Sequence, residues 1–339
     1  MKAMIKHKVK KIGVAFIILF LIHSFPLLLD AQPEGITFQE GFDNITIITN
    51  FMTLKINSLS PYFTWWNSNS SSPSEKFNIK FISIKEFFGD DEILDSPAEL
   101  GGISYDLAAN DWDYRITYDD NSVTVELQLS GLANGAEILF VLTIYNENKA
   151  ITGTDHFVDA LSEIKFDIIV NNWPFSINAR GLALFTYVFE SLENSAVKIR
   201  DGTLKEDGNA TQSLQFECSE DKTAFFEWTT FANVYNGANF VKNITVRKAS
   251  LADPFSLSLP ISPSKIPMYL TYPNYGNSLK LVHDPSIGVY PGNYSASVDA
   301  LSFFSIVTLL VAFVFIRKYS RIKRLQIHKG PKTENLYLG

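Results

Sequence analysis

The sequence predicts an all-β protein: an antiparallel β-sandwich, as one large or two smaller sandwiches, followed by one C-terminal transmembrane helix. Apolar and polar residues alternate with a period of two in many short runs, which is typical of strands with one buried and one solvated face. Turn-forming pairs such as Asp120-Asn121 and Asn134-Gly135 separate the runs. No stretch between residues 32 and 298 has a long helical period, so we expect a sandwich built from short strands.

The clearest alternation lies in residues 77–81, 123–129 and 163–170, which read FNIKF, VTVELQL and EIKFDIIV. Every second residue in these runs is apolar, and most residues between them are polar, so each run predicts a half-buried strand. Residues 137–145 and 182–189 are apolar on both faces. We therefore expect these two segments to be central strands that are buried on both sides.

The first 31 residues have the organisation of a signal peptide. Five lysines precede an uncharged, mostly apolar run from Ile12 to Leu29, and Ala31 supplies a small residue before a cleavage point at Gln32. The apolar run is longer than the usual 7–15 residues or so, so an uncleaved signal anchor is the alternative. The interruptions at His23, Ser24 and Pro26 favour cleavage.

A second apolar run near the C-terminus predicts the membrane anchor. Residues 301–316 contain twelve Leu, Ile, Val or Phe residues and no charge, and five basic residues follow within residues 317–324. Counted from Val298, the run reaches the ~20 residues that cross a bilayer. Because positive charge stays on the cytoplasmic side, we expect a type I cell-membrane protein with its N-terminal domain outside and the lipid bilayer as one partner. The alternative, a buried core helix, does not explain the basic cluster.

Charge and cysteine content describe the exported part. Residues 32–298 hold 17 basic and 33 acidic residues, a net formal charge of −16. Such a surface repels polyanions, so nucleic acid is not an expected partner. Cys218 is the only cysteine, so no intrachain disulfide can form, and its place in LQFEC predicts a buried free thiol.

These features divide the chain into five parts. We expect a signal peptide (1–31), a β-sandwich ectodomain (32–252), a membrane-proximal segment (253–297), the transmembrane helix (298–316) and a basic cytoplasmic tail (317–339). Residues 253–291 hold seven of the fourteen prolines, and proline removes ladder donors. We therefore predict edge strand or irregular chain there, held against the domain by Tyr269, Tyr272, Tyr275 and Tyr290.

An acidic run is the candidate metal site. Eleven carboxylates lie between Glu86 and Asp120, and Arg115 is the only basic residue among them. Calcium takes six to eight oxygen ligands, so the Gly89–Asp95 turn is a candidate calcium site with Asp90, Asp91, Glu92 and Asp95 as ligands. The run lacks the alternating spacing of an EF-hand loop, and the alternative is a solvated acidic loop.

Two further groups of residues suggest glycan chemistry. Trp65 and Trp66 are a candidate aromatic platform for sugar stacking, although adjacent strand residues point to opposite faces and one of the two is expected in the core. Five Asn-x-Ser/Thr sequons are candidate glycosylation sites in an exported chain: Asn44, Asn69, Asn209, Asn243 and Asn293.

No recognisable catalytic motif occurs. HExxH, CxxC, GxGxxG and P-loop patterns are absent, and the exported part has only His156 and His283. Asp111 and Asp113 are a carboxylate pair of the kind used in glycoside hydrolysis, but their spacing alone is not specific. We therefore predict no catalytic residues and no cofactor other than the candidate calcium ion.

Residues 62–189 resemble uncharacterised single-pass surface proteins found mainly in archaea. The similarity lies in FTWW, KFNIKFISIKEFFGDDEI, NDWDY, SEIKFDIIVNNWPF and LALFTYV. It implies a membrane-anchored, β-rich ectodomain. Together with the composition, it favours a binding, adhesion or envelope-structural role, with a surface protein or glycan as partner. The alternative is a membrane-tethered carbohydrate-active protein that binds or cleaves glycans.

Overall fold

The protein is represented by a computed structural model that describes residues 33–68, 76–109, 111–150, 157–190, 198–202, 211–218, 221–249, 251 and 265–290. The predicted signal peptide, transmembrane helix and tail lie outside these residues. Within them, no helix is long and apolar enough to span a bilayer. The prediction of an all-β, antiparallel class is confirmed, since the helical segments described are two short 3₁₀ turns, η1 (Pro97–Glu99) and η2 (Ala133–Gly135).

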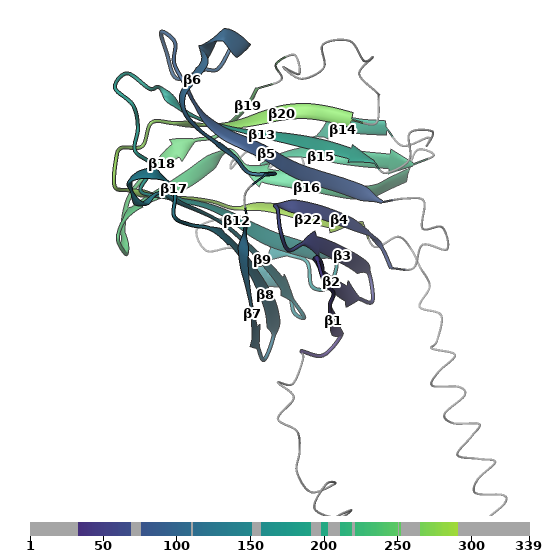
Figure 1. Cartoon of the computed structure of the whole chain (residues 1–339). Helices are drawn as coiled ribbons and strands as arrows, with labels where there is room; N and C mark the ends of the chain where they lie inside the picture. Colours follow the sequence, from purple (N-terminus) through teal and green to yellow (C-terminus); the bar gives the residue numbers. More distant parts are fainter. Residues whose placement is uncertain are drawn as a thin grey trace, which may run out of the picture. The chain divides into compact units, whose positions relative to one another are not determined.

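Sheet A has nine antiparallel strands in the order β1-β2-β3-β4-β5-β13-β20-β19, with β6 also paired to β5 (Figure 1). The strands are β1 (Ile36–Glu40), β2 (Asn44–Thr49), β3 (Met52–Asn57), β4 (Tyr62–Asn67), β5 (Phe77–Phe87), β6 (Leu100–Asp106), β13 (Gly181–Glu190), β19 (Arg247–Ala249) and β20 (Lys265–Pro273). Strand β5 is the branch point. Its residues 77–80 pair with β4 and its residues 83–87 with β6, while β13 runs along its other edge.

Sheet B has eleven antiparallel strands in the order β14-β15-β16-β22-β12-β21-β17-β18, with β9, β8 and β7 extending it from the other edge of β12. The strands are β7 (Asp113–Asp119), β8 (Ser122–Leu129), β9 (Glu137–Tyr145), β12 (Glu163–Asn171), β14 (Lys198–Gly202), β15 (Thr211–Cys218), β16 (Asp221–Thr229), β17 (Phe231–Asn236), β18 (Asn239–Thr245), β21 (Lys280–His283) and β22 (Pro285–Val289). A separate small sheet pairs β10 (Lys149–Ala150) with β11 (Phe157–Val158).

Aromatic side chains join the inner faces of the two sheets. Phe63 of sheet A lies 6.1 Å and 5.8 Å, between ring centroids, from Phe140 and Phe166 of sheet B. Trp65 packs edge-on against Phe216 and donates a hydrogen bond of 3.1 Å to the Gly288 carbonyl of β22. One buried apolar cluster therefore takes residues from both sheets, and the two sheets pack face to face.

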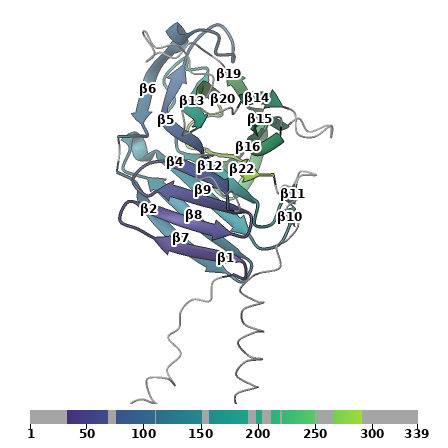
Figure 2. The same ribbon diagram turned by 90° about the vertical axis from the view of Figure 1, so that its right-hand side faces the viewer.

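At one lateral edge the sheets meet through β1 and β7 (Figure 2). Phe38 packs edge-on against Tyr118, and the Tyr114 hydroxyl donates a hydrogen bond to Glu40. At another edge the chain passes from β18 of sheet B to β19 of sheet A through the single residue Val246. The side-chain contacts at the first edge and the short connection at the second keep the two sheets together at their margins.

The predicted alternation is largely observed. The apolar residues of β8 and β12 that were predicted to face inward are buried, and residues 182–186 of β13 are buried on both faces. Strand β9 was predicted to be buried on both sides, but only every second residue is buried. Leu139 and Val141 are partly exposed, because none of the described strands covers the outer face of β9.

The prediction for the proline-rich segment is wrong for residues 265–289. β20 lies between β13 and β19, and β21 and β22 lie between β12 and the β16 and β17 strands. Prolines fit because Pro267 occupies a stretch of β20 that pairs only with β13, and Pro285 begins β22. The predicted tyrosine packing is confirmed for Tyr269, Tyr272 and Tyr275, which are buried.

Substitution of Phe63 tests the aromatic contact between the sheets. We expect Phe63→Ala to lower the free energy of unfolding by about 3–5 kcal/mol, because the buried ring contacts three other phenyl rings. Phe42→Ala is the control, since Phe42 is fully exposed. Urea unfolding of both variants measures the difference, and equal midpoints would contradict a shared core between the sheets.

Candidate functional site

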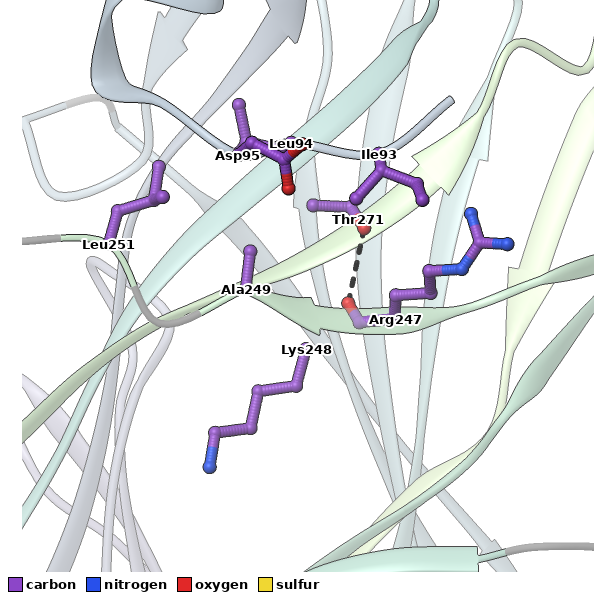
Figure 3. A pocket seen from close by; sticks show the side chains of 8 residues that line it. All are labelled: Ile93, Leu94, Asp95, Arg247, Lys248, Ala249, Leu251 and Thr271. Carbon is purple, nitrogen blue, oxygen red and sulfur yellow. Dashed lines mark hydrogen bonds between the residues drawn. The ribbon is translucent and has the colours of Figure 1, made fainter. Parts of the chain in front are cut away.

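A pocket of about 280 Å³ lies on the face of sheet A that points away from the main core. On β13, Leu182 and Leu184 belong to the main core, whereas Ala183 and Phe185 belong to a second, smaller apolar cluster with Phe87, Leu94 and Tyr269. The pocket lies beside this second cluster. Its lining residues are Ile93, Leu94, Asp95, Arg247, Lys248, Ala249, Leu251 and Thr271 (Figure 3).

The loop after β5 forms one wall of the pocket and β19 the other. The Arg247 guanidinium donates a 3.3 Å hydrogen bond to the Glu92 carbonyl, which ties the loop to β19. Thr271 donates a 3.2 Å hydrogen bond to the Arg247 carbonyl (Figure 3). The resulting pocket has apolar residues from the loop and β19, a single carboxylate, Asp95, and basic side chains at Arg247 and Lys248.

The candidate calcium ligands lie on this loop, and all four are exposed. The Asp91 carboxylate accepts the Ile93 amide at 2.8 Å, and the backbone amide of Asp95 donates to Glu99, so the loop is held by its own hydrogen bonds. Within the residues that the structure describes, no group of three or more His, Cys, Asp or Glu is arranged to hold a metal ion. Calcium binding by Asp90, Asp91, Glu92 and Asp95 stays a prediction.

Glu86, the first carboxylate of the acidic run, has a structural role, in contrast to the four exposed candidate ligands. It is fully buried and accepts N–H groups from Ile103, Ser176 and the Trp173 indole at 2.9, 2.7 and 3.2 Å. Gly102 has φ +61°, and a Cβ there would lie 2.1 Å from the carboxylate. This carboxylate therefore joins β5, β6 and the turn after β12.

The aromatic platform requires a correction. Trp65 is fully buried, since its indole packs between the sheets, and it cannot stack on a sugar. Trp66 points to the other face, is half-buried, and has the Lys76 ammonium 4.7 Å from its ring centroid. The expectation that one of the two lies in the core is confirmed. Trp112 and Trp173 are also buried.

The sequence did not reveal a charged cluster on the outer face of sheet B. The Lys165 ammonium lies 2.5 Å from Asp167 Oδ1 and 3.2 Å from Asp284 Oδ1. The three side chains are only 16–24% exposed. Lys165 and Asp167 share a face of β12, which the alternation of residues 163–170 predicts, but their contact with Asp284 depends on a pairing of strands distant in sequence.

The three charged groups of this cluster shift one another's pKa values. Burial, together with the nearby Asp284 carboxylate, raises the pKa of Asp167 to about 7 despite Lys165. Burial alone would raise the pKa of Asp284, but the Lys165 charge and the hydrogen bond from Asp167 hold that pKa below its usual value. Asp167 is therefore partly protonated near neutral pH, while Asp284 is ionised.

A buried histidine links the two sheets. His283 Nε2 lies 2.9 Å from the Thr229 carbonyl oxygen, and its Nδ1 lies 3.0 Å from the Tyr272 hydroxyl. Since a carbonyl oxygen only accepts, Nε2 carries the proton and Tyr272 donates to Nδ1. Burial lowers the pKa of His283 to about 4, so the ring is neutral and structural at neutral pH.

The remaining predicted residues lie in different places. Asn243 is exposed on β18 and Asn44 is half-buried on β2, whereas Asn69, Asn209 and Asn293 lie outside the described residues, as does His156. Cys218 is the last residue of β15, where Leu214 and Phe216 are buried; burial of the Cys218 thiol stays a prediction. Asp111 and Asp113 are both exposed.

No protein-family model matches this chain, and no curated protein matches it.

Acidification tests the role of His283. The folded state binds a proton at His283 only near pH 4, whereas the unfolded chain binds it near pH 6.5. The stabilisation is therefore complete above pH 6.5 and is lost as the pH falls to 4, by about 3 kcal/mol in total. Chemical unfolding across this range should show the loss in the wild type, in excess of any loss in His283→Gln, which does not titrate. Parallel pH profiles of the two proteins would contradict the assignment.

Proposed function

We propose that this chain is a single-pass type I membrane protein whose exported acidic domain binds a partner at the cell surface. The terminal segments of the sequence support the membrane anchor, and the exposed edge strand β18 supports partner binding. Six of the seven residues of β18 are exposed. We name this strand and β19, which follows it after one residue, the β18–β19 edge.

Edge strands bind partners through their open backbone groups. In the described residues β18 pairs only with β17, and β19 only with β20. Phe240 and Val241 are 57% and 47% exposed on β18. An extended segment of a partner can add a strand here, with backbone hydrogen bonds giving affinity and side chains giving specificity.

The charge of the β18–β19 edge favours an acidic partner segment. Lys242, Arg247 and Lys248 follow one another along this edge, although residues 32–298 carry a net charge of −16. Lys242 also disfavours pairing with a second copy of the same edge, because like charges would meet across the strands. The preferred ligand is therefore an extended peptide that alternates apolar and acidic residues.

The carbohydrate alternative has less support at the described pocket. Among the described residues, the pocket lining has one carboxylate, Asp95, and no aromatic side chain. Sugar sites commonly use stacked aromatic rings, and glycosidases use two carboxyl groups. Glycan binding or cleavage stays an alternative proposal.

Membrane topology is tested on whole cells that express the full chain. We expect the protein to resist extraction by alkaline carbonate, and we expect external protease to cleave within residues 32–297 while an epitope on residues 317–339 stays protected. Release by carbonate, or a protected N-terminal domain in intact cells, would contradict the anchor.

Partner binding is tested with the full chain in detergent micelles. The probe is a fluorescent peptide alternating Val with Glu, and the comparison peptide carries Lys in place of Glu. We expect only the acidic peptide to bind, and we expect Val241→Asp with Lys242→Glu to weaken it at least tenfold, about 1.4 kcal/mol. Ile177→Asp is the matched control, because Ile177 is 89% exposed on a turn of the chain between β12 and β13.

Two results would contradict the edge as the binding site. One is equal binding of the acidic and basic peptides; the other is equal loss in the β18 double variant and the Ile177 control. Asn243→Gln is measured in parallel, since a glycan on this exposed residue of β18 would cover the edge. Stronger binding by Asn243→Gln than by glycosylated wild type supports the same surface.

A further inference from the structure

Lys165 and Asp284 come from neighbouring strands and meet on the outer face of sheet B. The pairs Lys165↔Ser286 and Ile168↔His283 belong to one continuous register, which places Asp167 directly across from Asp284. Lys165 reaches diagonally to Asp284, with 3.2 Å between Nζ and Oδ1. Asp167 contacts the same ammonium at 2.5 Å, and the register places it beside Asp284 on the neighbouring segment of the chain.

We propose that Lys165 and Asp284 form an intramolecular amide bond, with Asp167 as the acid–base group for its formation. An amine, a carboxyl electrophile and a second carboxyl group beside both are the components that this condensation needs. Asp167 contacts the attacking nitrogen and lies across the strands from the electrophile, which makes it a catalytic residue for this reaction. This inference is independent of partner binding at the β18–β19 edge.

The reaction balances within the cluster. The Lys165 ammonium passes one proton to Asp284, which leaves a neutral amine, a neutral Asp284 carboxyl group and a protonated Asp167. Nζ then attacks Cγ of Asp284 and forms the C–N bond. Asp167 takes the proton that nitrogen loses and gives a proton to the departing hydroxyl. The C–O bond breaks, one water leaves, and Asp167 is protonated again, so no external acid, base or oxidant is consumed.

Two physical factors favour the amide over the ion pair. The Lys165 ammonium is held 3.2 Å from Oδ1 of Asp284, and reacting groups fixed in a productive geometry act as effective concentrations of about 10⁵–10⁸ M. The side chains are largely withdrawn from water, so ionic forms lose solvation that the neutral amide does not need. The amide would join β12 to the chain between β21 and β22. It would give a covalent cross-link to an exported protein whose single cysteine allows no intrachain disulfide.

The test is peptide mapping of the purified full chain by mass spectrometry after deglycosylation. We expect trypsin to leave Lys165 uncleaved, and we expect the peptides that contain residues 165 and 284 to appear as one species, lighter than their sum by one water. Lys165→Arg, Asp284→Ala and Asp167→Ala should each give separate peptides. Lys280→Arg is the control and should keep the linked species, because Lys280 lies over the Tyr235 ring and not in the cluster.

The Lys165→Arg variant distinguishes a covalent bond from an ion pair at this position. The guanidinium retains the charge, so a purely ionic cluster predicts nearly unchanged thermal stability, whereas loss of the amide predicts a lower melting temperature. Fully separate peptides from folded wild-type protein would overturn the proposal whatever the variants do. A link from Lys165 to Asp167 within one peptide would overturn the assignment of Asp284, and full linkage in Asp167→Ala would overturn the role of Asp167.

Discussion

The structure depends on aromatic packing between two antiparallel sheets. Phe63 and Phe81 of sheet A each contact Phe140 and Phe166 of sheet B, with ring centroids 4.7–6.1 Å apart. A sheet of nine strands and one of eleven can then bury their apolar faces in one core. Because the chain cannot form an intrachain disulfide, this apolar burial supplies the main driving force for folding.

Polar groups inside the molecule add specificity to that packing. Glu86 fixes three N–H groups at one end of sheet A, and His283 connects Tyr272 of sheet A to Thr229 of sheet B. Each group is buried and hydrogen-bonded, so removal of one partner leaves an unpaired polar atom in the core. These contacts add fixed points between strands whose register is already specified by their buried apolar faces.

The outer faces differ in chemistry, and this difference separates the candidate sites. Sheet A carries a second apolar cluster and the pocket beside β19, whereas sheet B carries the Lys165, Asp167 and Asp284 cluster. The β18–β19 edge runs from one sheet to the other and concentrates basic residues on an acidic domain. The proposed recognition at the β18–β19 edge and the proposed amide on the face of sheet B therefore use different parts of the same scaffold.

The sequence by itself determined the strand class, because a period of two in runs such as residues 123–129 requires an extended chain with one buried face. It also determined that one of Trp65 and Trp66 lies inside, since adjacent strand residues point to opposite faces. Only the tertiary structure decided which strands are neighbours: it placed the proline-containing β20 and β22 within the sheets and brought Asp284 to Lys165. Pairing between strands more than a hundred residues apart depends on the summed packing of whole faces, and no local pattern of residues records it.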